Sequence, residues 1–227
     1  MIIKKIINVM LHPFVYIRDY GRRGYFNWMP TKIYLRICYR ATFGNKLNFK
    51  DPKSYNEKLQ WLKIHHNYKS YSHLVDKYEV KKHIAKTIGS EYTIKTYGVY
   101  NTFEEIDFSK LPNAFVLKCT HDSGSVIVCE NKNKFNYNQA KTKIKKHLLT
   151  NHYYRYREPV YKYIKPRIIC EELISKNHEN LLDFKFFCFN GEVKYIQVDF
   201  NRFSNHTRNI YTPKWHLTDY TIKLPSG

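Results

Sequence analysis

A short polar loop between two apolar runs carries residue types that bind polyphosphates. Lys118 ends the first run, and the loop that follows reads His-Asp-Ser-Gly-Ser before the second run begins. Gly124 lets the backbone approach a ligand, Ser123, Ser125 and free N–H groups donate to phosphate oxygens, and Lys118 adds a positive charge. An ordinary hairpin with a solvated lysine explains the same residues equally simply, because short Gly/Ser loops are common.

Further along the chain, charged residues lie on expected strands. The run RIICEELI at 167–174 reads as a buried strand that ends in two carboxylates, Glu171 and Glu172. Two alternating runs then flank Asn190-Gly191, the strongest short signal for a β-hairpin. Asp183 and Lys185 share one face of the first of these strands.

Helices are expected in the first part of the chain and again after the polar loop. Ser54 is a good N-cap with Glu57 three residues later, which predicts a capping box. Segments 93–100 and 112–130 have the pattern of strands, and segments 150–166 and 201–227 that of irregular chain. The expected helices are 30–43, 54–66, 76–88, a short acidic one at 103–106, and 136–149.

Composition limits the class of protein and its partners. The 227 residues are 43% hydrophobic and 17% aromatic, which is enough for a folded core. A net charge of +20 favours anionic partners such as nucleotides, acidic polysaccharides, anionic lipid or nucleic acid. Because no DNA- or RNA-binding motif is present, specific nucleic-acid binding is not expected. The five cysteines form no CxxC pair and indicate reduced thiols in a cytoplasmic protein.

The first twenty residues are apolar with two early lysines. His12-Pro13 interrupts the run and no small-residue cleavage site follows, so neither a spanning helix nor a signal peptide is expected. A helix packed on the domain is the preferred interpretation. Peripheral association with an anionic membrane at the inner face of the cell is the alternative.

Five stretches form an ordered series along the chain: DPKSYNEKLQWLK, LVDKYEV, LPNAFVLKCTHDSGS, KPRIICEELI and DFKFFCFNGEVKYIQVDFNRFSNHTRN. Together, over about residues 30–215, they resemble the TupA-like ATP-grasp family of polysaccharide and teichuronopeptide biosynthesis. The resemblance implies an α+β, ATP-grasp-like fold with antiparallel sheets, flanking helices and a helical N-terminal region. It implies a helical region at 1–75, a first subdomain with the phosphate-lid hairpin at 76–165, and an incomplete second subdomain at 166–227.

The resemblance also implies an ATP site. Glu171 would accept a hydrogen bond from the adenine amino group, which is a donor, while Leu173 and Ile174 would contact the ring. A strand that simply ends in solvent explains Glu171 as well. The remaining nucleotide contacts would be Lys77 in the helix start, Lys118 on phosphate, Ser123, Gly124 and Ser125 in the lid, Asp183 near the ribose, and Lys185 on phosphate.

Arg202, His206 and Arg208 would face the reaction centre, where guanidinium groups can grip an acyl phosphate or an acidic acceptor. A basic loop in a basic protein is the plainer explanation. The acidic strand that normally supplies magnesium ligands to ATP-grasp enzymes is not seen after Asp219. The expectation is therefore a C-terminally truncated protein, or one in which Asp199 takes part in binding Mg²⁺.

Four functions remain open. The first is an ATP- and Mg²⁺-dependent carboxylate–amine ligase acting on an acceptor that contains uronic acid, in capsule or teichuronopeptide synthesis. The second is a glycosyltransferase-like protein, although no Asp-x-Asp motif is present. The third is a polyanion-binding protein, and the fourth an inactive nucleotide-binding fragment.

Overall fold

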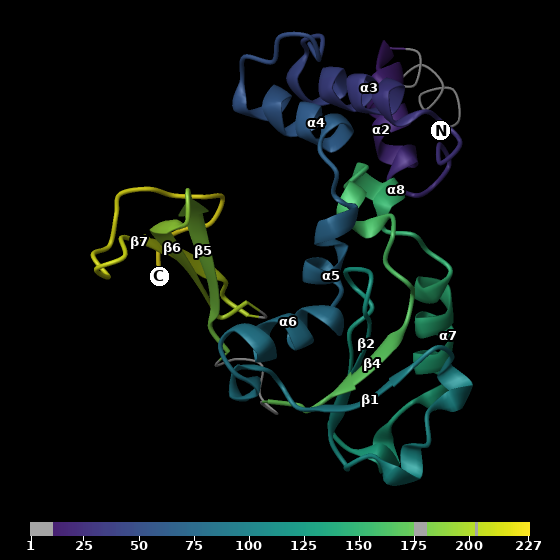
Figure 1. Cartoon of the computed structure of the whole chain (residues 1–227). Coiled ribbons are helices and arrows are strands. Elements are labelled where there is room, and N and C mark those ends of the chain that lie inside the picture. The colour runs from purple at the N-terminus through teal and green to yellow at the C-terminus, as the bar shows by residue number, and fades with distance from the viewer. Residues whose placement is uncertain (1–10, 175–180, 203) are drawn as a thin grey trace. The chain divides into compact units, whose positions relative to one another are not determined.

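The computed structural model describes residues 11–174, 181–202 and 204–227, so the first ten residues of the predicted N-terminal helix lie outside it. The chain forms two compact units, Met1–Glu172 and Leu173–Gly227, which we describe separately. Figure 1 labels their helices and strands. Within the described ranges, every helix is too short or too polar to cross a bilayer.

The described part of the first unit, from residue 11 on, begins with three helices that pack on one another. A capping box opens the third, since Ser54 Oγ accepts from Glu57 N (3.2 Å) and Glu57 Oε2 accepts from Ser54 N (2.9 Å), as predicted. Leu35 and Tyr39 pack with Leu47 in a small core of their own. The helices are α2 (Pro13–Gly21), α3 (Thr31–Phe43) and α4 (Tyr55–His65).

The helix predicted at 76–88 begins later than expected. Asp76 has extended backbone angles and caps the next turn instead, because its Oδ1 accepts from Tyr78 N (2.8 Å) and Glu79 N (3.2 Å). An aspartate in this role competes with helix formation at its own position. The helix that forms is α6 (Glu79–Thr87). The short helices η1 (Lys69–Tyr71) and α5 (Ser72–Val75) precede it, and η2 (Ser90–Tyr92) follows.

A four-stranded antiparallel sheet is the centre of the first unit, in the order β1-β4-β2-β3. The hairpin predicted around residues 121–125 is confirmed as β2 and β3. All four residues of β4 are buried, so the strand that ends in Glu171 is central, as its apolar sequence predicted. The strands are β1 (Thr96–Tyr100), β2 (Phe115–Cys119), β3 (Ile127–Cys129) and β4 (Ile168–Glu171).

Helix α7 (Tyr137–Leu148) completes the core of this unit. Ala140 and Ile144 are buried on its inner side and pack with Phe115 and Leu117 of β2. Asn136 is the N-cap of the helix, with its Oδ1 accepting from Gln139 N at 2.9 Å. The predicted acidic helix is a 3-10 turn, η3 (Phe103–Glu105), and the remaining short turns are η4 (Phe108–Lys110) and η5 (Lys132–Lys134).

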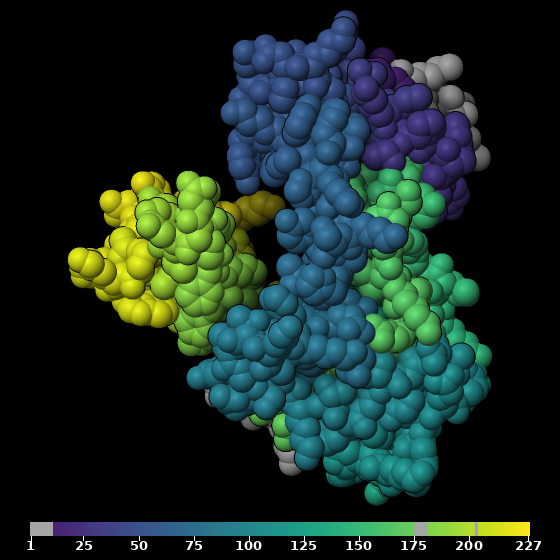
Figure 2. All heavy atoms as spheres, in the orientation of Figure 1, coloured from purple at the N-terminus to yellow at the C-terminus, as the bar shows by residue number. Residues whose placement is uncertain are grey.

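The segment 150–166, predicted as a loop, contains α8 (Tyr153–Tyr156) and η6 (Pro159–Tyr161) and ties the N-terminal helices to the sheet. Arg157, only 2% exposed, donates from Nη2 to Phe26 O at 2.7 Å. Its guanidinium carbon lies 4.7 Å from the Tyr34 ring and 5.0 Å from the Tyr154 ring. Figure 2 shows atoms of this green segment packed against the N-terminal helices.

The second unit is a three-stranded antiparallel sheet, β5 (Asp183–Phe189), β6 (Glu192–Phe200) and β7 (Thr207–Tyr211). The predicted hairpin is confirmed, and Asn190 (φ 51°) and Gly191 (φ 82°) form its turn. Strand β7 falls in the tail predicted to be irregular, so that prediction is wrong for residues 207–211. All five residues of β7 pair with residues 196–200 of β6, which compensates for the weak strand pattern of TRNIY.

Replacing Arg157 tests how strongly the N-terminal helices depend on α8. Arg157→Ala removes the bond to Phe26 and the contacts with the tyrosine rings. We expect the free energy of unfolding to fall by about 3 kcal/mol. Denaturant unfolding of the whole chain measures this change. The neighbouring, exposed Arg155→Ala is the control and should change stability by less than about 0.5 kcal/mol. Equal effects of the two variants would contradict the prediction.

Candidate functional site

A buried carboxylate with two lysine partners lies at the end of β4. Glu171 is 2% exposed and forms ion pairs with Lys118 of β2 and Lys81 of α6. Glu171 lies opposite Val116 in the sheet, so Lys118, two residues further along β2, projects from the same face and reaches it diagonally. Lys81 also donates to Ile94 O (2.6 Å) and Thr96 Oγ1 (2.9 Å), which fixes its ammonium group.

A third lysine approaches the same place from the turn before α6. Lys77 Nζ donates to Cys119 O (2.7 Å) and Asp122 O, and lies 3.7 Å from Asp122 Oδ1. Burial lowers the pKa of Lys77, the carboxylate of Asp122 partly offsets this, and the positive charge of Lys118 lowers the pKa further. The cations of Lys77, Lys81 and Lys118 thus gather near two carboxylates, an arrangement suited to an added anion.

The loop between β2 and β3 is held by its own side chains. Ser125, 1% exposed, accepts from Cys119 N (2.8 Å) and donates to Asp122 Oδ1 (2.6 Å), while His147 Nδ1 of α7 bonds Asp122 Oδ2. Because the aspartate stands between the serine and the histidine, the imidazole does not activate the hydroxyl as a catalytic triad would. The network instead fixes the base of the loop.

The predicted lid residues therefore differ in their environment. Ser123 and Gly124 are exposed, and Gly124 has φ +101°, a left-handed conformation that glycine adopts without strain. The hydroxyl of Ser125 is already bonded within the loop. Ser123 and Gly124 are thus the two loop residues whose polar groups face solvent.

The predicted adenine contacts lie close together in the sequence but in different surroundings. Both oxygens of Glu171 are paired with lysines, so a bond to adenine would require one of these pairs to open. Leu173 is half-buried and Ile174 is 61% exposed, at the start of the second unit. The adenine roles of all three stay predictions.

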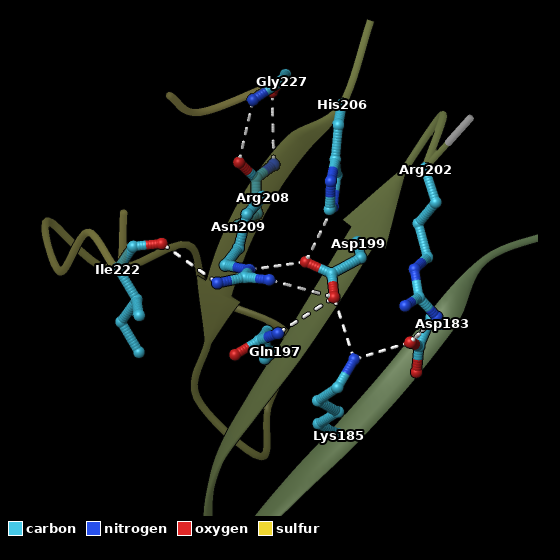
Figure 3. Close-up of polar contacts among 10 residues, drawn as sticks. All are labelled: Asp183, Lys185, Gln197, Asp199, Arg202, His206, Arg208, Asn209, Ile222 and Gly227. Atoms are coloured by element: carbon cyan, nitrogen blue, oxygen red, sulfur yellow. Dashed lines mark hydrogen bonds and ion pairs between the residues drawn. The ribbon is translucent and has the colours of Figure 1, made fainter. Parts of the chain in front are cut away.

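In the second unit, six of the predicted residues form one polar cluster (Figure 3). Asp199, 1% exposed, forms ion pairs with Lys185 Nζ (2.9 Å) and with the guanidinium of Arg208, its cross-strand partner. Asp183 bonds Lys185 Nζ at 2.6 Å and also pairs with Arg202. The sixth member is His206, whose Nε2 lies 3.4 Å from Asp199 Oδ1.

The electrostatics of Asp199 bear on its predicted role as a magnesium ligand. Burial raises the pKa of Asp199, but hydrogen bonds from Arg208 and Lys185 outweigh this and hold the pKa below its ordinary value. Gln197 Nε2 donates as well, at 3.0 Å. Magnesium requires several oxygen ligands. As placed, Asp199 faces nitrogen donors, and no metal-binding group of three or more His, Cys, Asp or Glu side chains occurs among the described residues. The donor set does not fit Mg²⁺.

Sequence reasoning missed several residues that build these clusters. Lys81 could have been found from its spacing, since it follows Lys77 by four residues. Asp122 lies within the polar loop already singled out, but His147 is 25 residues away and gave no local signal. Gln197 shares the face of β6 with Asp199 because the two residues are two positions apart.

Comparison with known proteins identifies a family. The sequence model described as "TupA-like ATPgrasp" matches residues 57–226, which is more than half of the chain. No curated protein and no solved structure matches significantly. The matched region includes every residue that was assigned a role in the ATP site or the reaction centre.

The importance of Glu171 for the lysine cluster can be tested by stability. Glu171→Gln leaves Lys81 and Lys118 beside a neutral amide, and we expect the free energy of unfolding to fall by about 2–3 kcal/mol. The exposed neighbour Glu172→Gln is the matched control and should be near neutral. Denaturant unfolding at neutral pH measures both. No difference between the two variants would mean that the ion pairs do not support the fold.

Asp199 makes stability depend on pH in acid. Because its pKa is lower in the folded than in the unfolded protein, its contribution is fully present above about pH 4 and is lost as pH falls toward the folded pKa. Hydrogen exchange of β6 and β7 should lose protection on acidification in the wild type. In Asp199→Asn protection should be lower already at pH 7 and change less in acid. The exposed Asp219→Asn should behave like the wild type, and identical profiles for Asp199→Asn and wild type would refute the assignment.

Proposed function

The chain belongs to the TupA-like ATP-grasp family, and on this premise we propose that it binds ATP and activates a carboxylate for attack by an amine. The acceptor we propose is an acidic, uronic-acid-containing polysaccharide of the cell surface. The proposal rests on one observation: the ammonium groups of three lysines lie close together beside the exposed loop residues Ser123 and Gly124. The lysines are Lys77, Lys81 and Lys118. That arrangement suits a triphosphate.

The phosphate contacts follow from the charges in the first unit. Lys118 and Lys81 share one buried carboxylate, so their two positive charges are only half compensated by Glu171. A phosphate oxygen that approaches Lys118 gains a charge-assisted bond while Lys81 continues to neutralise Glu171. The exposed backbone of Ser123 and Gly124 supplies N–H groups and lets the phosphates approach closely.

The reaction we propose proceeds in two balanced steps. A carboxylate oxygen of the acceptor attacks the γ-phosphorus, the bond from that phosphorus to the bridging oxygen breaks, and ADP leaves. The amine nitrogen then attacks the carbonyl carbon of the acyl phosphate, inorganic phosphate leaves with the C–O bonding electrons, and the nitrogen loses a proton. Catalysis would rest on positioning and on charge stabilisation.

The second unit offers cations for such charge stabilisation. Arg202 is bound only through one guanidinium nitrogen to Asp183 among the described residues, so its other donors are free for a carboxylate or phosphate. Arg208 and His206 lie beside Asp199, and we propose that they orient the carboxylate of the acceptor. ATP-grasp proteins generally use Mg²⁺ with ATP. The neighbours of Asp199 are nitrogen donors, so this carboxylate is not a suitable ligand for the metal as it is placed.

The proposed setting follows from the substrate. ATP is available in the cytoplasm, and a protein with a net charge of +20 would be attracted to anionic lipid at the inner face of the membrane. Peripheral association there would bring the protein close to a growing polymer. We propose no specific nucleic-acid partner.

Thermal stability with ligands tests the nucleotide site. ATP should raise Tm of the wild type, by an amount equivalent to about 2.7 kcal/mol when ATP is at a hundred times Kd. Lys118→Met should remove most of this shift. Lys134→Met, an exposed lysine on η5, should keep it. The titration is run with and without Mg²⁺, and with UDP-glucose in place of ATP.

The other outcomes discriminate among functions. A shift with UDP-glucose and none with ATP would overturn the ligase proposal in favour of a glycosyltransferase-like protein. An ATP shift that survives Lys118→Met would place the triphosphate elsewhere. An ATP shift without release of phosphate in the presence of acceptor and amine would indicate a nucleotide-binding protein that does not turn over.

A further inference from the structure

A pocket of about 880 Å³ opens in the first unit beside Asp122. Its walls come from three separate segments, within residues 19–27, 122–123 and 146–155. Arg22 and Arg23 follow α2, Lys146 and His147 end α7, and Arg155 lies on α8. A volume of this size accommodates an ordinary small-molecule or oligosaccharide ligand. Of the lining residues, Ser123 is the one with a role in the proposed ATP site.

The lining is strongly basic and its charges are largely uncompensated. Within the part of the chain that the structure describes, none of four basic side chains has an acidic partner: Arg22, Arg23, Lys146 and Arg155. The two acidic residues in the pocket wall both have hydrogen-bond partners of their own. Asp19 pairs with Arg18 (2.8 Å), and this hydrogen bond together with the nearby charges of Arg22 and Arg23 lowers its pKa. Asp122 bonds Ser125 and His147. One carboxylate thus faces several cations. The pocket therefore presents a positive interior that an anionic ligand would neutralise.

The arginines are held in place by aromatic rings. The guanidinium carbon of Arg22 lies 5.2 Å from the centre of the Tyr156 ring, and that of Arg155 lies 5.4 Å from the same ring. Arg23 stacks similarly on Tyr20, at 5.2 Å. Stacking restricts the side chains while leaving the guanidinium edges free, which lowers the entropic cost of gripping a carboxylate.

The remaining lining residues suit a sugar better than a bare anion. Tyr154 presents an aromatic body with a polar end, although Arg157 already stacks on its ring. Asn27 carries an amide that can donate and accept, and Asn151 offers its amide nitrogen, because its Oδ1 already accepts from Tyr153 N at 3.0 Å. Sugar hydroxyls need both donors and acceptors, and the apolar face of a sugar ring packs on aromatic carbon. Carboxylates distributed along a saccharide would meet the arginines, while its hydroxyls would meet the amides.

We propose that this pocket is the binding site for the acidic acceptor, a saccharide that carries carboxylates. The inference rests on the proposed ligase function for the identity of the acceptor, although the pocket chemistry is independent of ATP. Ser123, one of the two exposed residues of the phosphate loop, lines the same pocket. The loop thus connects the acceptor pocket with the lysine cluster through Asp122, whose main-chain oxygen accepts from Lys77.

Binding of a defined oligogalacturonide to the full chain tests the proposal, measured by calorimetry at about 150 mM salt so that diffuse attraction is screened. Arg23→Gln combined with Arg155→Gln should weaken binding about tenfold or more, because two charge-assisted contacts are lost. Arg36→Gln combined with Arg40→Gln is the matched control. These exposed arginines also stack on aromatic rings, Phe49 and Phe14, and removing them takes away the same charge. The control should change the affinity less than about threefold.

Two further ligands decide the chemistry. A neutral maltooligosaccharide of equal length should bind much more weakly, because it lacks carboxylates. Tripolyphosphate should not compete with the oligogalacturonide at comparable concentration. Equal loss of affinity in both double variants, or equal binding of tripolyphosphate to the pocket, would overturn the proposal in favour of unspecific anion binding.

The same samples separate this inference from the proposed function. The ATP-induced rise in Tm should survive in Arg23→Gln/Arg155→Gln, and oligogalacturonide binding should survive in Lys118→Met. Saccharide binding without an ATP-induced rise in Tm would support the proposed saccharide pocket and refute the proposed ligase function. An ATP-induced rise in Tm without saccharide binding would support the proposed nucleotide site and refute the proposed role of the pocket.

Discussion

A carboxylate buried at the end of a central strand is the constraint around which the first unit is arranged. An unpaired charge at Glu171 would cost several kcal/mol, so cations must reach it. Lys118 comes from the neighbouring strand β2, and Lys81 comes from α6, which is thereby tied to the end of β4. Docking α6 in turn brings Lys77, in the turn before it, onto the carbonyl groups of the loop. The same pairing that stabilises the fold thus concentrates positive charge beside the loop.

The second unit follows the same logic with a different geometry. Asp199 is buried on the central strand of its sheet, and the register of β6 with β7 places Arg208 directly opposite. Lys185 of β5 reaches the carboxylate from the other side. Both flanking strands are therefore joined to the central strand by side chains as well as by the backbone ladder. A low pKa at Asp199 is the electrostatic result, because its charged form is the one that holds the three strands together.

The sequence revealed the parts of this protein that depend on neighbours in the chain. The capping box at Ser54, the hairpin at Asn190-Gly191 and the buried run of β4 were predicted because each is set within a few residues. The late start of α6 and the strand β7 were missed, since a side-chain cap and an edge pairing overrode weak local patterns. Long-range pairs such as Asp122 with His147 have no signature in a single sequence. The residue types of the candidate site were predictable, and their partners were not.

Arg157 shows that the recognisable family region and the folding unit have different limits. The match to the family begins at residue 57, yet the carbonyl of Phe26 and the ring of Tyr34, which enclose the Arg157 guanidinium, come earlier in the chain. A protein shortened to the matched residues would lose Tyr34 and expose the Arg157 cation together with the Tyr154 ring beside it, a surface prone to self-association. Arg157, which directly follows α8, therefore makes the N-terminal helices an integral part of the first unit rather than a detachable appendage.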